Sequence, residues 1–451
     1  MLTTTFTFKQ ASATPKYQQL VTYFKNAIKL RHLGTTAALP SIRKLATTLE
    51  VSRTTVETAY AILLAEGYII SKPQRGYYAV DLSTSQPSAT LAPAVAPQPE
   101  PTVRYNFANN YIDSRTFNTA LWRRCLNNIL KEPTVIASYG QAQGEQVLRT
   151  VLATYSYEAR GVICTPEQIV IGAGIQSLLD VLIGILPATY HAVALEAPGF
   201  PQAERIFTDH HWQVSHFQTE KMTADLPPLL VVSPSNPYKG RALTAAERRA
   251  LLTWTQTTQG LILEDDYNGE FRYFSRPISA LQGLAGGASV IYLGSFSRLL
   301  MPSLRISYMV LPPSLVPCYQ QVAGLYNQTS STIEQLALAA FISGGHLRRH
   351  VRHLRKLYAV KNELLRAALQ NIFGSKALVR SYASGLHLRL AIVSPHTAED
   401  LAAKALAVGV LILPVHATTN DVYPEILLSF VGIAAEHIEP ALSLLKKTWF
   451  D

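Results

Sequence analysis

A proline-rich segment in the first quarter of the chain limits how the whole sequence can fold. Residues 81–102 read DLSTSQPSATLAPAVAPQPEPT, with five prolines, few charged residues and no aromatic side chain. A segment of this composition cannot form a hydrophobic core and behaves as a semi-extended spacer. We therefore expect the 451 residues to form a small domain at residues 1–80, a linker at residues 81–102 and a body at residues 103–451.

The composition is typical of a globular protein, with 48% hydrophobic and 16% charged residues. The most apolar stretch, residues 169–186, is interrupted by Gln176, Asp180 and three glycines, so we expect no membrane span. The N-terminus has no signal-peptide pattern, and the three cysteines fit neither a disulfide framework nor a metal site. These features predict a cytoplasmic protein with no metal centre and no membrane partner.

The positive charge is concentrated in the small domain. Residues 1–80 contain ten basic and three acidic residues, which gives +7 of the total net charge of +10. The remaining 371 residues therefore share only +3. A basic terminal segment of this kind points to nucleic acid or another acidic surface as its partner.

The small domain has the pattern of a helix-turn-helix followed by a hairpin. Apolar residues recur at every fourth position of residues 16–31, which predicts an amphipathic helix. Ser41 and Ser52 are suitable N-cap residues for two further short helices. Two strands, at residues 68–70 and 77–80, flank the turn SKPQRG. The second of the two short helices can then enter the major groove of DNA.

Hydroxyl and guanidinium groups stand where this helix would meet DNA. They are Ser52, Arg53, Thr54 and Thr55, with Arg75 at the tip of the hairpin. Such groups bind phosphates, and arginine also reads guanine edges. The alternative is a small helical bundle with a solvated face, but the helix order, the hairpin and the charge together favour binding to double-stranded operator DNA.

The segment resembles the winged helix-turn-helix of the GntR family through LPSIRKLA, VSRTTVETAY, EGYI and RGYYAV. This resemblance places five residues at the family's DNA-contacting positions: Arg43, Arg53, Thr54, Thr55 and Gly76.

The body contains apolar strands that end in polar residues. VIGAGIQSLLDVL predicts a strand, a tight turn and a helix, with the backbone N–H groups of Gly174, Ile175 and Gln176 free to bind a phosphate. LLVVSPSNPYKG ends in Asn236, and GLILEDDYNGEF ends in carboxylates followed by Tyr267. Alternating strands and helices with polar strand ends indicate an α/β sheet with a site along one edge.

GSFSRLLMPSLRISY, residues 294–308, adds two hydroxyls and two guanidiniums, which are groups that bind anions. By itself this stretch is equally consistent with a solvated loop that carries two surface arginines. Together with the other strand ends it suits pyridoxal phosphate, although an enzyme of that kind also needs a lysine for the Schiff base.

The body resembles fold-type I aminotransferases, and with the small domain it resembles the MocR subfamily of GntR regulators. The motifs that carry this resemblance are YGQAQGEQVLR, RGVICTPEQIVIGAG, EAPGF, EDDYNGEFRY, YLGSFSRLLMPSLRISY and GHLRRHVRHLRKLY. It implies an α/β chain: a winged helix-turn-helix domain and an aminotransferase-like domain with a mostly parallel sheet and a smaller C-terminal α+β part. It also implies a homodimer.

The resemblance assigns roles toward pyridoxal phosphate to residues across the body. Asp265 would face the pyridine nitrogen, and Phe200 would cover the ring face. The ring oxygen would meet Asn236 and Tyr267. The phosphate would be held by Gly174, Ile175, Gln176, Ser295 and Arg305, with Tyr139 reaching in from the second subunit.

Arg298 stands where the family has its Schiff-base lysine. A guanidinium stays protonated and is not a nucleophile, so no covalent link to the cofactor can form there. Ser303 and Ser307 also replace family glycines, and the C-terminal strand EILLSF lacks the arginine that often binds a substrate carboxylate. The nearest substitute is Arg389.

Three functions follow for the body. It binds a small-molecule effector without covalent chemistry, which is the reading we favour, with pyridoxal phosphate held reversibly or absent. It serves only as a dimerisation scaffold. Or it is an active aminotransferase, which would need a lysine from elsewhere, such as Lys239.

A basic segment, GGHLRRHVRHLRKLY, carries His346, His350 and His353 at helical spacing. Histidine titrates near neutral pH, so a proton sensor is conceivable, but neighbouring positive charge would lower the pKa of these groups. A solvated basic helix is the simpler interpretation.

Overall fold

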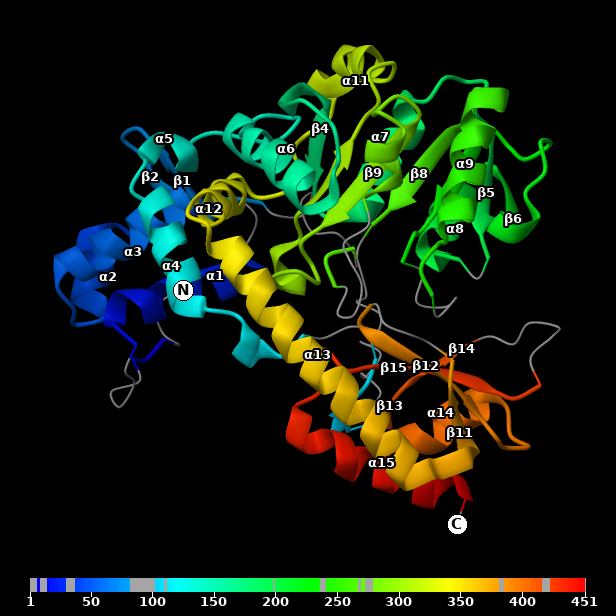
Figure 1. Ribbon diagram of the computed structural model, residues 1–451. Coiled ribbons are helices and arrows are strands. Elements are labelled where there is room, and N and C mark those ends of the chain that lie inside the picture. The colour runs from blue at the N-terminus through cyan, green and yellow to red at the C-terminus, as the bar shows by residue number, and fades with distance from the viewer. Residues whose placement is uncertain are drawn as a thin grey trace. The chain divides into compact units, whose positions relative to one another are not determined.

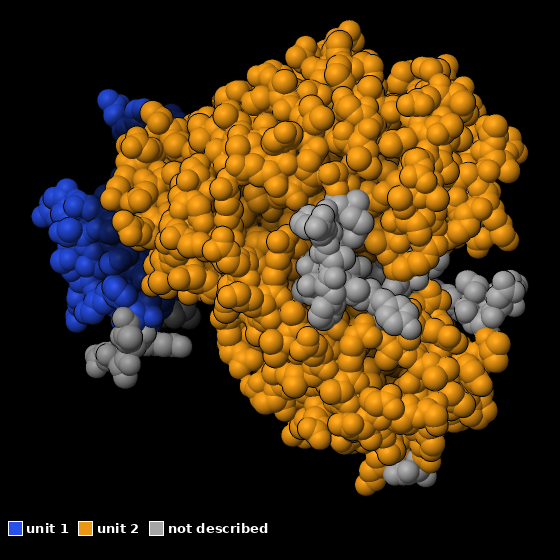
Figure 2. Space-filling model, viewed as in Figure 1, with its two compact units in different colours: residues 1–98 blue, residues 99–451 orange. Residues whose placement is uncertain are grey.

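The structure, a computed structural model, describes residues 6–8, 14–29, 37–81, 102–108, 112–197, 199–235, 241–266, 269–271, 279–380, 385–415 and 422–450. The chain divides into two compact units, residues 1–98 and 99–451, which Figure 2 shows in different colours. Nearly all of the predicted linker lies outside the described residues.

The first unit contains three helices and a two-stranded hairpin. Their bounds are α1 Lys16–Lys29, α2 Ile42–Thr48, α3 Arg53–Ala65, β1 Ile69–Lys72 and β2 Gly76–Ala79. The predicted N-caps are confirmed, since Ser41 Oγ accepts from the Lys44 N–H and Ser52 Oγ accepts from the Thr55 N–H. The hairpin strands extend further than predicted, because β1 reaches Lys72 and pairs it with Gly76, which leaves a turn of three residues.

The core of the first unit joins α1 to α3. Leu20, Phe24 and Ile28 of α1 are buried, as are Val56 and Tyr60 of α3. The buried Tyr60 hydroxyl donates to the Pro40 carbonyl at 2.9 Å, which ties α3 to the start of α2. The apolar spacing of the sequence therefore predicted the packing of these helices.

A seven-stranded sheet forms the centre of the second unit (Figure 1). Its strand order is β4-β10-β9-β8-β7-β5-β6; β10 runs antiparallel to both neighbours and the other pairings are parallel. Its strands are β4 Ile169–Gly172, β5 Ala192–Glu196, β6 Gln213–Phe217, β7 Leu229–Val232, β8 Leu261–Asp265, β9 Val290–Ser295 and β10 Ser307–Val310. Every residue of β4, β7, β8 and β10 is buried, as expected of strands covered on both faces.

Helices connect and flank these strands. The α-helices of this part are α4 Thr119–Ile129, α5 Pro133–Ile136, α6 Gln146–Arg160, α7 Ile175–Ile185, α8 Pro201–Asp209, α9 Ala245–Thr258, α10 Leu281–Leu284, α11 Val316–Val322 and α12 Thr332–Ser343. Short 3-10 turns lie at Ser114–Thr116, Pro166–Gln168, Thr219–Lys221, Pro302–Leu304, Ala323–Leu325 and Gly374–Lys376. The start of α9 is fixed by a capping box in which Thr244 and Glu247 bind each other's backbone N–H.

A smaller sheet, order β11-β12-β15-β14, forms the C-terminal part of the second unit, where α13 and α15 pack together (Figure 1). Its pairings are all antiparallel. The elements are α13 His346–Phe373, β11 Ala377–Val379, β12 His387–Ile392, α14 Ala398–Ala407, β14 Leu413–Val415, β15 Glu425–Ser429 and α15 Ala435–Phe450. The strand β3, Tyr105–Asn106, pairs in parallel with β13, Val410–Leu411, and so joins the start of the unit to its C-terminal part.

None of the helices in the described part of the chain combines the length and apolar character of a bilayer span. The described residues also contain no group of three His, Cys, Asp or Glu side chains placed to hold a metal ion.

Candidate functional site

The predicted DNA contacts of the first unit are Arg43 of α2, four residues at the start of α3 and two residues of the hairpin. Arg53 and Thr54 are exposed, and the Arg53 side chain, 72% exposed, pairs with Glu57 at 3.0 Å. Ser52 and Thr55 share a hydrogen bond of 2.8 Å between their hydroxyl oxygens, so these groups stabilise the helix start as well. Arg43, on α2, is also exposed.

The hairpin presents Arg75 and Gly76 to solvent. The Arg75 N–H donates to the Lys72 carbonyl at 3.0 Å and closes the turn. Gly76 has φ +92°, a conformation that L side chains rarely adopt, so the turn requires glycine at this position. The hairpin therefore holds the Arg75 backbone in a fixed turn at an exposed tip.

In the second unit, strand pairing brings the predicted phosphate-binding residues together. Ser307 of β10 pairs with Gly172 of β4 on one side and with Ser295 of β9 on the other. The Ser307 hydroxyl donates to Ser295 Oγ at 3.1 Å. The ends of three neighbouring strands thus place Ser295 near the turn that leads from β4 into α7.

Gly174 and Arg305 meet at that turn. Gly174 precedes α7 with φ +100°, and a Cβ there would lie 2.4 Å from Arg305 Nη2. Arg305 Nη2 donates to the Ala173 carbonyl at 3.1 Å, which holds the guanidinium against the helix N-terminus. Ile175 begins α7 and is partly buried, whereas Gln176 is exposed. A helix N-terminus beside a guanidinium is an anion-binding arrangement.

Asp265 ends β8 and is 95% buried. Its Oδ1 atom has no hydrogen-bond partner among the described residues. Burial, followed by the charges of Asp266 and Glu264, raises the pKa of Asp265 to about 7. A buried carboxyl group held in this state is suited to pair with a protonated nitrogen of a ligand.

Arg298 lies in the turn that follows β9, five residues after Leu293, which pairs with Asp265. Its side chain is partly buried. Its charge contributes to lowering the pKa of His387 and acts on Tyr358, so both side chains lie near the guanidinium. Tyr358 belongs to α13 and His387 to β12.

Comparison with known proteins identifies both units. Residues 16–78 match the family model "Bacterial regulatory proteins, gntR family". The chain is 37% identical to the uncharacterized HTH-type transcriptional regulator YdeL of Bacillus subtilis, over 96% of this chain and 97% of that protein. It is 32% identical to the probable rhizopine catabolism regulatory protein MocR of Rhizobium meliloti, over 78% and 76% of the two chains.

The chain belongs to the MocR-type GntR family.

Two further comparisons bear on the second unit. The HTH-type pyridoxine biosynthesis transcriptional regulator PdxR of Corynebacterium glutamicum is 30% identical over 82% of this chain and 81% of that protein. The solved kynurenine aminotransferase of Pyrococcus horikoshii superposes with a TM-score of 0.67 at 21% identity, covering 77% of this chain and 91% of that one. The predicted fold, a GntR-type DNA-binding domain joined to a fold-type I aminotransferase-like domain, is therefore confirmed.

Of the other residues predicted for the pocket of this MocR-type chain, the structure describes Phe200 and Tyr139. Phe200 immediately precedes α8 and is partly buried against the core. Tyr139 is 98% exposed. Asn236, Tyr267 and Lys239 lie outside the described residues, so their predicted positions remain predictions.

The structure also describes Arg389 and the histidines of the basic segment. Arg389, considered as a carboxylate-binding residue, forms an ion pair with Glu425 of β15. Burial and positive neighbours lower the pKa of His346, and burial lowers that of His350. Both histidines lie on α13.

Sequence reasoning missed a buried ionic cluster behind Asp265. Arg160 Nε donates to Asp266 Oδ2 at 2.6 Å, and the Tyr292 hydroxyl donates to the same oxygen at 3.1 Å. Glu264 accepts from the backbone N–H groups of Leu281 and Gln282 at 2.7 and 2.9 Å. These contacts fix the end of β8 and hence the position of Asp265.

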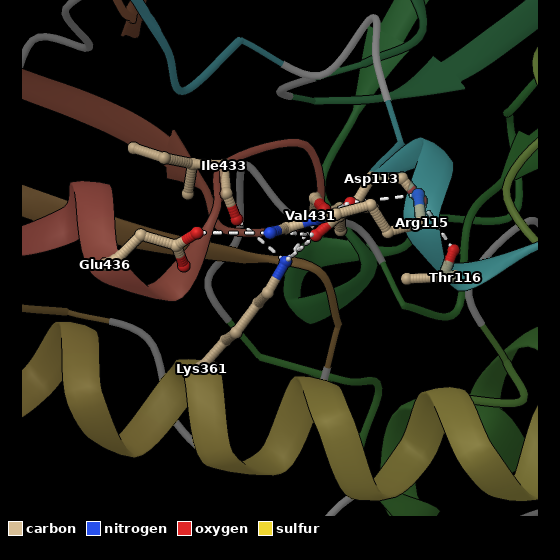
Figure 3. A network of polar contacts seen from close by, with 7 residues as sticks. All are labelled: Asp113, Arg115, Thr116, Lys361, Val431, Ile433 and Glu436. Carbon is tan, nitrogen blue, oxygen red and sulfur yellow. Dashed lines mark hydrogen bonds and ion pairs between the residues drawn. The ribbon is translucent and has the colours of Figure 1, made fainter.

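A second network, shown in Figure 3, fixes the start of the unit to α13. Lys361 Nζ donates to Asp113 Oδ2 at 3.1 Å and to the Ile433 carbonyl at 2.7 Å. Arg115 binds the same Asp113 carboxylate. Burial alone would raise the pKa of Asp113, but the hydrogen bonds from Arg115 and Lys361 lower it to about 2.

Sequence reasoning also missed three buried polar side chains, Tyr358, His387 and Ser429. They come from α13, β12 and β15, which are distant in sequence. The available signal was a polar residue inside an apolar strand, as in GLHLRL and ILLSF.

Proposed function

We propose that this chain is a transcription regulator that binds operator DNA through its first unit and binds pyridoxal phosphate, or a close analogue, non-covalently in its second unit. One observation carries the ligand part of the proposal. The Oδ1 atom of the buried Asp265 has no hydrogen-bond partner among the described residues. Asp265 pairs with Leu293 of β9, the strand that precedes Arg298.

The described residues fit the groups of pyridoxal phosphate, which brings a phosphate, a ring nitrogen and an aldehyde to its site. Asp265 would meet the ring nitrogen and Phe200 the ring face. The phosphate would be held by Gly174, Ile175, Gln176, Ser295 and Arg305, whose contact at the start of α7 supports this role. Asn236 and Tyr267 would meet the ring oxygen.

Arg298 would occupy the position of the Schiff-base lysine. Because a guanidinium cannot form that bond, the unit would act by reversible binding and not as an aminotransferase. The relatives support this proposal, since YdeL, MocR and PdxR are named as regulators. PdxR is named for pyridoxine biosynthesis, which makes pyridoxal phosphate the first ligand to test.

The DNA-binding part would use Arg43, Ser52, Arg53, Thr54, Thr55, Arg75 and Gly76. In a homodimer, two such domains would meet two half-sites of the operator. Tyr139, being almost fully exposed, is available to reach the pocket of a second subunit. The proposed linker, residues 81–102, would set the reach between the domain at residues 1–80 and the body at residues 103–451.

Equilibrium dialysis of the full chain against pyridoxal phosphate tests the ligand part. We expect saturable binding that is reversed by dialysis and weakened by Asp265→Ala, while Asp209→Asn, on the exposed surface of α8, leaves it unchanged. The absence of saturable binding in the folded wild-type chain would contradict the proposal and favour a dimerisation scaffold.

A further inference from the structure

The segment of residues 328–330, just before α12, contacts the turn that precedes α7 and the Arg305 guanidinium beside it, which together we call the anion site. The Thr329 hydroxyl accepts a hydrogen bond of 2.9 Å from the Ala173 N–H. Arg305 Nη2 donates to the Ala173 carbonyl at 3.1 Å. Thr329 and Arg305 therefore bind the two backbone polar groups of the residue directly before Gly174.

The next residue of the segment, Ser330, binds the backbone of Arg305. The Ser330 hydroxyl donates to the Arg305 carbonyl at 3.3 Å. Arg305 has φ +52°, a left-handed conformation that is unfavourable for a residue with a side chain. Such a conformation persists only where surrounding contacts stabilise it. The bond from Ser330 is one such contact, and it fixes the backbone from which the guanidinium extends.

Two glutamine side chains hold the segment in place. The Ser330 N–H donates to Gln328 Oε1 at 2.8 Å, and Gln328 Nε2 donates to the Ala142 carbonyl at 3.0 Å. The fully buried Gln335 donates from Nε2 to the Ser330 carbonyl at 3.1 Å, and its Oε1 accepts from the Glu145 N–H at 2.8 Å. The backbone of the segment is therefore fixed, which orients its two hydroxyls.

We propose that Thr329 and Ser330 are positioning residues that determine how tightly the anion site binds a phosphate group. The planar fork of a guanidinium matches phosphate, and binding is weaker when a group must first be ordered. Because the two hydroxyls hold Ala173 and Arg305, they keep the guanidinium at the start of α7 before a ligand arrives. This inference rests on the proposed function and deepens it, since it names the residues that prepare the phosphate subsite.

Two ligands that differ only in the phosphate, pyridoxamine 5′-phosphate and pyridoxamine, test the proposal. Neither carries an aldehyde, so neither can form a Schiff base with a lysine of the chain. Isothermal titration of the full wild-type chain should give a lower Kd for the phosphate ligand. Thr329→Val and Ser330→Ala should each raise that Kd about fivefold, as expected for the loss of one hydrogen bond, and leave the Kd of pyridoxamine unchanged.

The conservative variant Thr329→Ser tests whether the hydroxyl itself is responsible. Serine can also accept from the Ala173 N–H, so this variant should bind pyridoxamine 5′-phosphate with the wild-type Kd. A Kd as high as that of Thr329→Val would overturn the role of the hydroxyl.

Thr258→Val is the matched control for a general loss of stability. The exposed Thr258 hydroxyl also accepts from a backbone N–H, that of Gly260 at 3.2 Å, but it lies at the end of α9, before β8 begins. Both valine variants should therefore lower the melting temperature by a similar small amount. Only Thr329→Val should weaken binding of the phosphate ligand.

The outcomes separate this inference from the proposed function. If Thr329→Val and Ser330→Ala keep the wild-type Kd of pyridoxamine 5′-phosphate, or weaken both ligands by the same factor, the positioning role is overturned and the phosphate subsite stands. If the folded wild type binds both ligands equally well, the phosphate subsite is overturned together with this inference. If neither ligand binds to the folded wild type, the ligand part of the proposed function is overturned as well.

Discussion

At the scale of single residues, the buried carboxyl of Asp265 links stability to ligand binding. Its pKa is raised because burial and the neighbouring Asp266 and Glu264 disfavour the charged form. A ligand cation placed against Oδ1 would relieve part of that cost. A buried carboxyl group such as that of Asp265 lowers the free energy of unfolding when no ligand is bound, and such groups are common in binding sites.

The raised pKa of Asp265 predicts a pH-dependent effect of Asp265→Asn. Between the unfolded pKa near 4 and the folded pKa of about 7, only the folded state retains the proton. The free energy of unfolding therefore falls as pH rises through this window. Asparagine does not titrate, so the variant does not lose stability in this way. The free energy of unfolding of Asp265→Asn minus that of the wild type should therefore increase from pH 4 to pH 8 by on the order of 1 to 4 kcal/mol.

Urea unfolding of both chains at pH 4 and pH 8, without ligand, measures this change. A difference between wild type and variant that is independent of pH would show that Asp265 does not titrate in this window.

Substitution of Arg53 and Arg75 tests the proposed DNA interface. Arg53→Ala should weaken operator binding by roughly 1 to 3 kcal/mol if the guanidinium reads a base edge. Arg75→Ala should weaken binding more evenly across sequences, as expected of a phosphate contact. Gel-shift titrations on operator and unrelated DNA distinguish the two effects.

Arg205→Ala is the matched control for Arg53→Ala. Arg205 is similarly exposed and also pairs with the carboxylate four residues later, but it lies on α8 of the second unit. It should leave DNA affinity unchanged. Equal affinities for wild type, Arg53→Ala and Arg75→Ala would remove α3 and the hairpin from the proposed interface.

The sequence predicted the local groups of the candidate site better than its distant ones. Gly174, Asp265 and Ser295 stand in short motifs at the ends of strands that run in the same direction, and Arg305 precedes the antiparallel β10, so all four lie at one edge of the sheet. The buried polar side chains Tyr358, His387 and Ser429 come from α13, β12 and β15, and no local pattern specifies their burial. Only tertiary packing brings α13 against those strands.

At the scale of elements, helix starts were predictable and hairpin ends were not. Ser41 and Ser52 fix α2 and α3 through short-range hydrogen bonds that the sequence encodes directly. The strands β1 and β2 extend into the predicted turn, because pairing of Lys72 with Gly76 depends on the positive φ of Gln74 and Gly76. The resemblance implied only a mostly parallel sheet, and the strand order of the large sheet was not predicted.

The long helix α13 is held by Lys361, which predicts a large effect of Lys361→Met. The side chain is 1% exposed and binds Asp113 and the carbonyls that follow β15 (Figure 3). Removing one member of a buried ion pair leaves the other without full compensation, so the free energy of unfolding should fall by about 3 kcal/mol.

Lys356→Met, at an exposed position of the same helix, should change the free energy of unfolding by less than about 0.5 kcal/mol. Urea unfolding of the three chains makes the comparison. If the two variants were equally stable, the buried network would not anchor α13.

At the scale of the whole molecule, the proposed linker would determine how the two DNA-binding domains of the proposed homodimer reach one operator. A proline-rich spacer keeps its ends apart, so its length sets the reach. Deleting about half of residues 83–101 should therefore change the preferred spacing between half-sites without unfolding either unit. Footprinting on operators of varied spacing measures this preference, and identical preferences before and after the deletion would show that the linker is passive.

The central claim is that the second unit binds its ligand without a covalent bond because Arg298 replaces the Schiff-base lysine. Borohydride reduction in the presence of pyridoxal phosphate, followed by intact-mass and peptide mass spectrometry, tests it in the wild type and in Arg298→Lys. The account predicts no stoichiometric site-specific adduct in the wild type and one phosphopyridoxyl group on residue 298 of the folded variant. A stoichiometric adduct at a single lysine of the wild type, such as Lys239, or no adduct at position 298 of the variant, would contradict it.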